Sequence, residues 1–561
     1  MYTIAKNVQI VIALLKEHGI KHLVLSPGGT NAAFVRGVQD DPYFDCFSVV
    51  DERSALYFAI GIYLSTGKIV AVCCTSAQAT RNYIPGLTEA FYKHVPILAI
   101  TFSKHPQYTY QEYMQAPDQT SLPKDAVRAS YALPYISNEH DRMQCERMAN
   151  EAILELTHRT PAPIQLNVPM LDSELTQDAA SELPAVKVIR RYSSSDIMKI
   201  KQGDQKIMIV IGENRGIDDA EIVRFAASTN TIIYVNQLSN LKNDYTVNGN
   251  LLLTCITQKE FDENYCPDIL ITIGGQTGDY PLYHKLAGSS VKYEHWRISE
   301  SGDVVDTYDH LTRVYECSIN EFFSSCHDSV SNCDYREYWK QSVKLYHTNV
   351  ELPLSAAFVA QQMSKIIPEG SYVNFSILNS LRTWNLFEFK NKVKCFCNVG
   401  AFGIDGCMST FFGQSVMVDD LCFMFVGDLS FFYDMNSLGI RHIKNNVRII
   451  LINNNGGVEF KLGGNAEINA KTDKFIAAAG HFRNAEGWAL TNGFNYRLVK
   501  TKEDFFALSD TLVKKSDAPI LVEVSISDVE DYNGYSSLLK TNDNRTLAQK
   551  VTGRLMRIIN R

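Results

Sequence analysis

The sequence lacks the features of a membrane or nucleic-acid-binding protein. No uninterrupted apolar run reaches the roughly 18 residues that a membrane span needs. The 54 Lys and Arg stand against 62 Asp and Glu, a net charge of −8. We therefore expect neither a nucleic-acid nor a membrane partner. Residues 1–16 are too polar for a secretory signal and read as an amphipathic helix.

Disulfide and zinc patterns are also missing. The 13 Cys form no CxxC pair, and neither HExxH nor HxH occurs. The closest sets, Cys73-Cys74 and Cys395-x-Cys397, lie in apolar runs typical of strands, where buried free thiols are common. We expect structural thiols in a reducing compartment, and so a cytoplasmic protein.

What the sequence does contain is short apolar runs that alternate with helical patterns along all 561 residues. Continuous apolar runs favour strands buried on both faces, and the helices between them favour parallel sheets of an α/β fold. The candidate strands are Leu23–Ser26, Ile69–Cys74, Ile97–Thr101, Ile164–Val168, Ile207–Ile211, Ile232–Val235, Ile269–Ile273, Cys422–Val426, Val447–Ile452 and Leu521–Val524.

Two polar stretches, 171–196 and 326–352, are typical of linkers. They predict three α/β domains at 1–180, 190–340 and 350–561. We expect each to hold a mainly parallel sheet flanked by helices.

Polar motifs follow two predicted strands of the last segment. Gly427-Asp428-Leu429-Ser430 follows one strand, and Asn453 to Gly457 follows the next. Open parallel sheets bind ligands at the carboxyl ends of their strands. The Asp428 carboxylate, the Asn454 side-chain carbonyl and a backbone carbonyl near Gly456 are oxygen ligands that suit Mg²⁺.

Each motif alone is an ordinary turn. Together, with Asp428 and Asn454 26 residues apart, they resemble the signature of thiamine-diphosphate enzymes. Asp51-Glu52-Arg53 alone is typical of a solvated helix start. The resemblance implies instead that Glu52 contacts N1′ of the cofactor's aminopyrimidine and promotes loss of the thiazolium C2 proton. It also implies a buried carboxyl group with a raised pKa.

The whole chain resembles the thiamine-diphosphate synthase family of menaquinone biosynthesis. The motifs that carry the resemblance include Ser26-Pro27-Gly28, Asp51 to Ala55, Cys74-Thr75-Ser76, Asn82-Tyr83-x-Pro85, Ala162 to Pro169, His295 to Ile298, Gly400 to Gly406, Gly427 to Ser430 and Asn453 to Gly457.

This family implies a pyrimidine-binding, a central and a diphosphate-binding domain. It also implies an active site between two chains of a homodimer or a dimer of dimers, with thiamine diphosphate and Mg²⁺ as cofactors. The metal ligands would be Asp428, Asn454 and Gly456. The cofactor-binding residues would be Glu52, Thr75, Ser76, Gly403, Ile404, Asp405, Gly427, Asp428, Leu429, Ser430, Asn454 and Gly456.

The sequence departs from the family where substrates bind. The family joins 2-oxoglutarate to isochorismate and holds their carboxylates with arginines. Its Ser-Arg after Pro-Gly reads Gly29-Thr30 here, and its Asn-Arg-Gly-Ala has Val399 in place of the arginine. The substrate-site candidates are Gly29, Thr30, Lys104, His105, Gln115, Arg382, Val399 and Lys461.

Because the cofactor motifs are present and most carboxylate-binding arginines are not, the leading hypothesis is a diverged lyase or carboligase. It would decarboxylate a 2-oxo acid, for example one that lacks a second carboxylate such as pyruvate, and pass the carbanion to an unknown acceptor or to a proton. Two alternatives stay open: a true menaquinone-pathway synthase, and a non-catalytic relative.

The assignment of Glu52 predicts a separation of binding from turnover. Glu52→Gln should keep thiamine-diphosphate affinity and abolish CO₂ release from a 2-oxo acid, because the tautomer shift needs a carboxyl group. Calorimetric titration of the cofactor beside a CO₂ assay measures both. Near-normal turnover in the variant would disprove the assignment.

Overall fold

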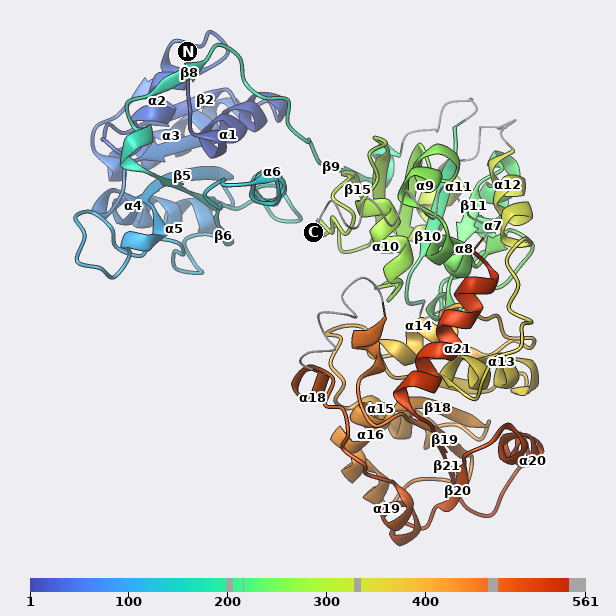
Figure 1. The fold of residues 1–561 in the computed structure, drawn as a ribbon. Helices are drawn as coiled ribbons and strands as arrows, with labels where there is room; N and C mark the ends of the chain where they lie inside the picture. Colours follow the sequence, from blue (N-terminus) through green and yellow to red (C-terminus); the bar gives the residue numbers. More distant parts are fainter. Residues whose placement is uncertain (198–204, 215, 327–333, 463–472, 544–561) are drawn as a thin grey trace. The chain divides into compact units, whose positions relative to one another are not determined.

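The computed structural model describes residues 1–197, 205–214, 216–326, 334–462 and 473–543 (Figure 1). The chain divides into two compact units. Unit 1 is Met1–Asp196 with Glu300–Glu316, and unit 2 is Ile197–Ser299 with Cys317–Arg561. Each unit is described by itself.

Unit 1 contains a six-stranded parallel sheet with helices on both faces. One apolar core packs α1 (Lys6–Glu17), α2 (Ala32–Gln39) and α6 (Glu139–Glu155) on the sheet. A second core packs α3 (Glu52–Thr66) and α5 (Ile84–Tyr92) on it. The strand order is β3 (Asp45–Ser48), β2 (His22–Leu25), β4 (Val70–Cys74), β5 (Ile97–Lys104), β7 (Ile164–Met170) and β6 (Ala129–Ala132).

Unit 2 contains two further sets of parallel strands. The first has the order β12 (Thr246–Val247), β11 (Ile232–Tyr234), β10 (Ile207–Ile211), β13 (Ile269–Ile273) and β14 (Glu294–Ile298). The second has the order β17 (Lys394–Cys397), β16 (Tyr372–Phe375), β18 (Cys422–Gly427), β19 (Val447–Asn453), β21 (Ile520–Ser525) and β20 (Asn495–Val499).

Helices cover both faces of this last sheet, because alternate strand residues point to opposite sides. Phe423 and Phe425 join a core with α13 (Ala356–Ile366), α14 (Asn379–Asn385), α20 (Lys502–Leu512) and α21 (Asp528–Thr541). Met424 and Val426 join a core with α15 (Cys407–Ser415), α16 (Asp428–Tyr433) and α19 (Glu486–Thr491). The α/β fold class with three parallel sheets is therefore confirmed.

All ten predicted strands are present, with ends that differ by up to three residues. The sequence analysis missed strands such as β3 and β20, which lie at sheet edges and are too exposed to be continuously apolar. The predicted linker 326–352 is wrong in part. It contains the helix α12 (Tyr335–Val343), whose Trp339 is fully buried.

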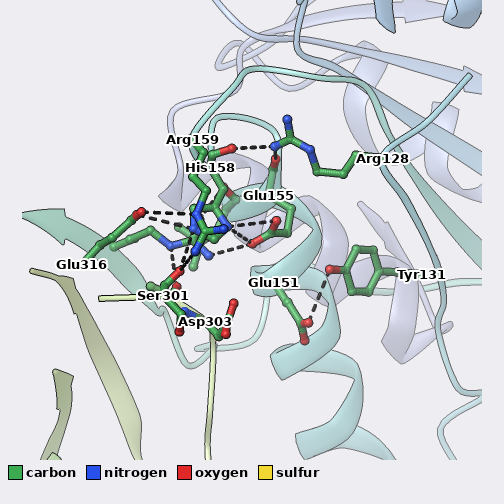
Figure 2. Close-up of polar contacts among 12 residues, drawn as sticks. Arg128, Tyr131, Glu151, Glu155, His158, Arg159, Ser301, Asp303 and Glu316 are labelled. Carbon is green, nitrogen blue, oxygen red and sulfur yellow. Dashed lines mark hydrogen bonds and ion pairs between the residues drawn. The ribbon is translucent and has the colours of Figure 1, made fainter. Parts of the chain in front are cut away.

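A polar cluster ties Glu300–Glu316 into unit 1. The strand β9 (Arg190–Ser193) pairs in parallel with β15 (Leu311–Glu316). Figure 2 shows His158 at the centre of the cluster, where its ring contacts the Glu155 carboxylate (2.9 Å) and the Ser301 carbonyl oxygen (3.0 Å). The side chain of Arg191 donates to Glu155 (2.7 Å) and to the Gly302 carbonyl (2.8 Å). Unit 1 thus extends beyond 1–180, and the three boundaries stay a prediction.

Two sequence expectations can be compared with the described part of the chain. Its cysteines are all free thiols, and burial raises the pKa of Cys73 to about 12. These inert thiols fit a structural role. No helix among the described residues is long and apolar enough to cross a membrane.

The strand that leads into the Asn453–Gly457 loop is anchored by a buried arginine. Arg448 of β19 is 0% exposed, and its guanidinium donates to the carbonyls of Leu512 (3.0 Å), Asn445 (2.7 Å) and Val447 (2.8 Å). Burial lowers the pKa of Arg448 to about 10.

Arg448→Met should therefore lower the free energy of unfolding by about 3 kcal/mol, because it removes the guanidinium donor from the buried carbonyl groups of Leu512 and Val447. Chemical denaturation measures the change. Arg497→Met, on the exposed face of β20, is the matched control and should cost less than about 0.5 kcal/mol. Equal effects of the two substitutions would contradict the anchoring role.

Candidate active site

The two halves of the Asp428 and Asn454 motif meet at one edge of the C-terminal sheet. The strands β18 and β19 are parallel neighbours, with Gly427 opposite Ile452. Their carboxyl ends therefore lie side by side (Figure 1). The backbone N–H of Gly456 donates to the Asp428 carboxylate over 3.0 Å. The structure thus brings three predicted metal-site residues together.

Asp428 is buried beside a histidine. It is 2% exposed and accepts hydrogen bonds from the backbone N–H groups of Leu429 (2.7 Å) and Gly456. The ring nitrogen Nε2 of His481 lies 3.0 Å from the same carboxylate. Burial raises the pKa of Asp428, and the contact with His481 opposes that rise.

The side chain of Asn454 uses only one of its two ends. Its Nδ2 donates to the Oδ2 atom of Asp531 over 2.8 Å. Its Oδ1 is buried and has no hydrogen-bond partner among the described residues. Asp531 is 3% exposed, and burial raises its pKa. A buried carbonyl oxygen without a partner is costly, so it indicates a site for a ligand.

These groups fit a hard cation. Mg²⁺ binds few protein oxygens and keeps places for water and substrate phosphate. The site offers the Asp428 carboxylate and the unpartnered Asn454 Oδ1. Within the described ranges, no group of three His, Cys, Asp or Glu residues could hold a metal. The loop is closely packed, since a Cβ at Gly456 would lie 3.0 Å from the Ala477 carbonyl.

The predicted cofactor residues of this unit also gather around α16. The hydroxyl of Ser430 donates to the Ile404 carbonyl over 2.7 Å. Ile404 is partly buried against the apolar core. A Cβ at Gly403 would collide with the Asp405 carboxylate at 2.2 Å. The Gly403–Asp405 turn therefore lies against the Gly427–Ser430 motif.

Unit 1 places Glu52 at the first turn of α3. Asp51 caps this helix by accepting from the backbone N–H groups of Arg53 (2.9 Å) and Ser54 (3.3 Å). Glu52 is half-buried and accepts from Asn82 Nδ2 over 3.2 Å. In this single chain Glu52 is only partly buried, whereas the resemblance implies a buried carboxyl group in the working site.

The Gly29-Thr30 turn contacts the end of β4 in the same unit. The backbone N–H of Thr30 donates to Thr75 Oγ1 (3.1 Å), and its hydroxyl lies 3.1 Å from Ser76 Oγ. Thr30 is buried. Gly29 and Thr30, predicted for substrate, and Thr75 and Ser76, predicted for cofactor, thus form one cluster.

The two lysines and the arginine predicted near the substrate each form an ion pair with a carboxylate. Lys104 pairs with Asp172 and Lys461 with Asp528.

Arg382 lies 2.6 Å from Glu459, with both side chains 17% exposed, and its guanidinium lies over the Tyr280 ring. Such pairs neutralise the charges that a substrate carboxylate would need.

The remaining substrate candidates are Val399, His105 and Gln115, and each has a different environment. Val399 is 1% exposed and packs in the apolar core with Leu381. The ring of His105 packs edge-on against Tyr135. Gln115 has a left-handed backbone (φ 58°) and lines a shallow pocket with Arg81 and Tyr110.

The sequence analysis missed Asp531 and His481. Asp531 lies in the acidic first turn of α21, where an aspartate is the usual residue beside the helix dipole. His481 stands alone in its segment. Neither position carries a local signal.

Comparison with known proteins agrees with this geometry. Residues 6–122 match the family described as "Thiamine pyrophosphate enzyme, N-terminal TPP binding domain". The 2-succinyl-5-enolpyruvyl-6-hydroxy-3-cyclohexene-1-carboxylate synthase of Bacteroides thetaiotaomicron is 32% identical over 93% of this chain and 96% of the relative. The chain belongs to this synthase family.

Further matches extend the comparison. The synthase of the same name from Phocaeicola vulgatus is 33% identical over 90% of this chain and 92% of the relative. A solved structure described as a "putative thiamin diphosphate-dependent enzyme" from Mycobacterium smegmatis aligns with 93% of this chain and 99% of its own, at 16% identity and a TM-score of 0.42. As a member of the synthase family, the chain is a thiamine-diphosphate-dependent enzyme.

The geometry predicts that Asp428→Ala raises the apparent Kd for Mg²⁺, measured in the presence of thiamine diphosphate, by about 100-fold or more. A loss of this size matches the largest effects seen when a residue that merely orients a metal ligand is replaced. Calorimetric titration measures it. Asp434→Ala is the matched control, because this nearby aspartate accepts from Ser409 instead. An unchanged Kd in Asp428→Ala would place the metal elsewhere.

Proposed function

We propose that the chain uses thiamine diphosphate and Mg²⁺ to decarboxylate a 2-oxo acid and join the remaining carbon unit to a second substrate. One observation carries the proposal: in a chain of this family, a buried aspartate lies at the end of one strand, and an asparagine oxygen without a partner among the described residues lies at the end of the adjacent strand. The Asp428 carboxylate and Asn454 Oδ1 would hold Mg²⁺, with the Gly456 carbonyl as the third protein ligand.

Thiamine diphosphate, when bound, supplies a nucleophilic carbon for the 2-oxo acid and an electron sink for the loss of CO₂. The turn around Gly403 and Ile404 and the Leu429-Ser430 backbone would line the cofactor site. Glu52, oriented by Asn82, would hold the aminopyrimidine by its carboxyl group. Thr75 and Ser76 would complete this part of the site with their hydroxyls.

We propose that two chains form the catalytic unit, as a homodimer or a dimer of dimers. The helix that begins at Glu52 carries the exposed apolar side chains of Tyr57 (47%), Phe58 (46%) and Leu64 (62%). Exposed apolar patches mark interaction surfaces. A second copy packed on α3 would cover these side chains and bury Glu52. We place this enzyme in the cytoplasm.

Membership of the synthase family makes 2-oxoglutarate and isochorismate, the pair that the sequence resemblance implies, the first substrates to propose. It favours the menaquinone-pathway synthase, which the sequence analysis kept open, over the leading hypothesis of that analysis. A second candidate, a donor without a second carboxylate such as pyruvate, is supported by a specific observation. Arg382, Lys104 and Lys461 are each paired with a carboxylate, and Val399 is apolar.

A CO₂-release assay separates the two candidates. The protein with thiamine diphosphate and Mg²⁺ is given pyruvate, 2-oxoglutarate, phosphonopyruvate or sulfopyruvate, each with and without isochorismate. The synthase reaction predicts release from 2-oxoglutarate that rises with isochorismate. Release from another acid alone would support the diverged donor. Cofactor binding with no release from any acid would contradict both.

A further inference from the structure

A cation can use the Oδ1 atom of Asn454 only if the amide is held in one of its two orientations. The two ends of an asparagine amide have nearly the same shape, so hydrogen bonds decide which end faces which way. A carboxylate can only accept hydrogen bonds. Asp531 therefore selects the Nδ2 end of Asn454 (2.8 Å) and leaves Oδ1 on the opposite side.

We propose that Asp531 is a positioning residue for the cation site: it fixes the amide of Asn454 so that Oδ1 is presented to the metal. The inference rests on the proposed Mg²⁺ and thiamine-diphosphate site and adds to it a residue outside the metal's own ligands. Partners of this kind tune metal sites because they orient the ligands.

Asp531 is itself held in place by two other elements. Its Oδ1 accepts from the backbone N–H of Ala356 (2.7 Å), the first residue of α13, and its Oδ2 lies 3.5 Å from Asn379 Nδ2 of α14. These groups and Asn454 Nδ2 are all donors. The Asp531 carboxylate thus has a fixed orientation, and its hydrogen bond to Nδ2 fixes the orientation of the Asn454 amide.

The neighbouring asparagine shows that this arrangement is specific to Asn454. Asn453 also donates through Nδ2 to a buried carboxylate, that of Glu523, over 2.6 Å. Its Oδ1, however, accepts from the backbone N–H of Asn455 (3.3 Å). Both ends of Asn453 are used within the protein, whereas Asn454 keeps one buried oxygen without a partner among the described residues.

The isosteric substitution Asp531→Asn should reverse the orientation of the Asn454 amide. The Ala356 N–H needs an acceptor, so the new amide oxygen stays there and the new NH₂ faces Asn454. Two NH₂ groups cannot bond to each other. The Asn454 amide then rotates and presents its own NH₂, a donor, where the cation needs an oxygen.

The test is the Mg²⁺ affinity of the full-length protein, measured by calorimetric titration of MgCl₂ at saturating thiamine diphosphate. Asp531→Asn should raise the Kd for Mg²⁺ by roughly 10- to 100-fold. Glu523→Gln is the matched control, since it removes an equally buried carboxylate from the neighbouring asparagine. It should change the Kd less than about threefold, and the thermal melting of both cofactor-free variants shows that they fold.

A double substitution tests orientation separately from stability. In Asn454→Asp/Asp531→Asn the new NH₂ donates to the new carboxylate at position 454, whose second oxygen replaces Asn454 Oδ1. We expect the Kd for Mg²⁺ to fall at least tenfold from that of Asp531→Asn. A role of Asp531 in stability alone predicts no such recovery.

The outcomes separate the two levels of the proposal. Wild-type protein that binds no Mg²⁺ with thiamine diphosphate would overturn the proposed function. Wild-type binding with an unchanged Kd in Asp531→Asn would overturn the positioning role and leave the function standing. An equal loss in Glu523→Gln, or no recovery in the double variant, would also overturn the positioning role.

Discussion

The parallel pairing of β18 with β19 is the constraint on which the site depends. It brings the chain after Gly427 and the chain after Asn453 to the same sheet edge, so that Gly456 can donate to Asp428 over 3.0 Å. The buried Arg448 anchors the start of β19, and both faces of the sheet are covered by apolar cores. A shift of one residue in this pairing would turn buried strand residues to the wrong face.

Burial determines the electrostatics of this edge. Asp428 and Asp531 lie out of water, and their pKa values are raised for that reason. Each is surrounded by hydrogen-bond donors: backbone N–H groups and His481 at Asp428, and Ala356 and Asn454 at Asp531. Asn454 Oδ1, by contrast, has no hydrogen-bond partner among the described residues. This oxygen is the atom that the proposed cation would bind.

The same principle bears on substrate choice. A buried carboxylate of a substrate needs a charged partner. Here Arg382 already lies 2.6 Å from Glu459, and Val399 packs in the core. The family membership and the ion pairs therefore favour different 2-oxo acid substrates. Family membership rests on similarity along the whole chain, whereas the ion pairs concern only the residues predicted to contact the substrate. The cofactor chemistry is common to both.

The sequence by itself determined the ten apolar strands, the α/β class and the residues Glu52, Asp428 and Asn454 as site candidates. Each of these is a local signal, since an apolar run or a short motif lies within a few residues of chain. The tertiary structure alone decided the partners of these residues. Asp531 lies 77 residues from Asn454 and His481 lies 53 residues from Asp428. The ion pairs of Arg382 and Lys461 and the helix in 326–352 also emerge only from packing. Hydrogen bonds and burial depend on which distant segments meet, and no local pattern records that.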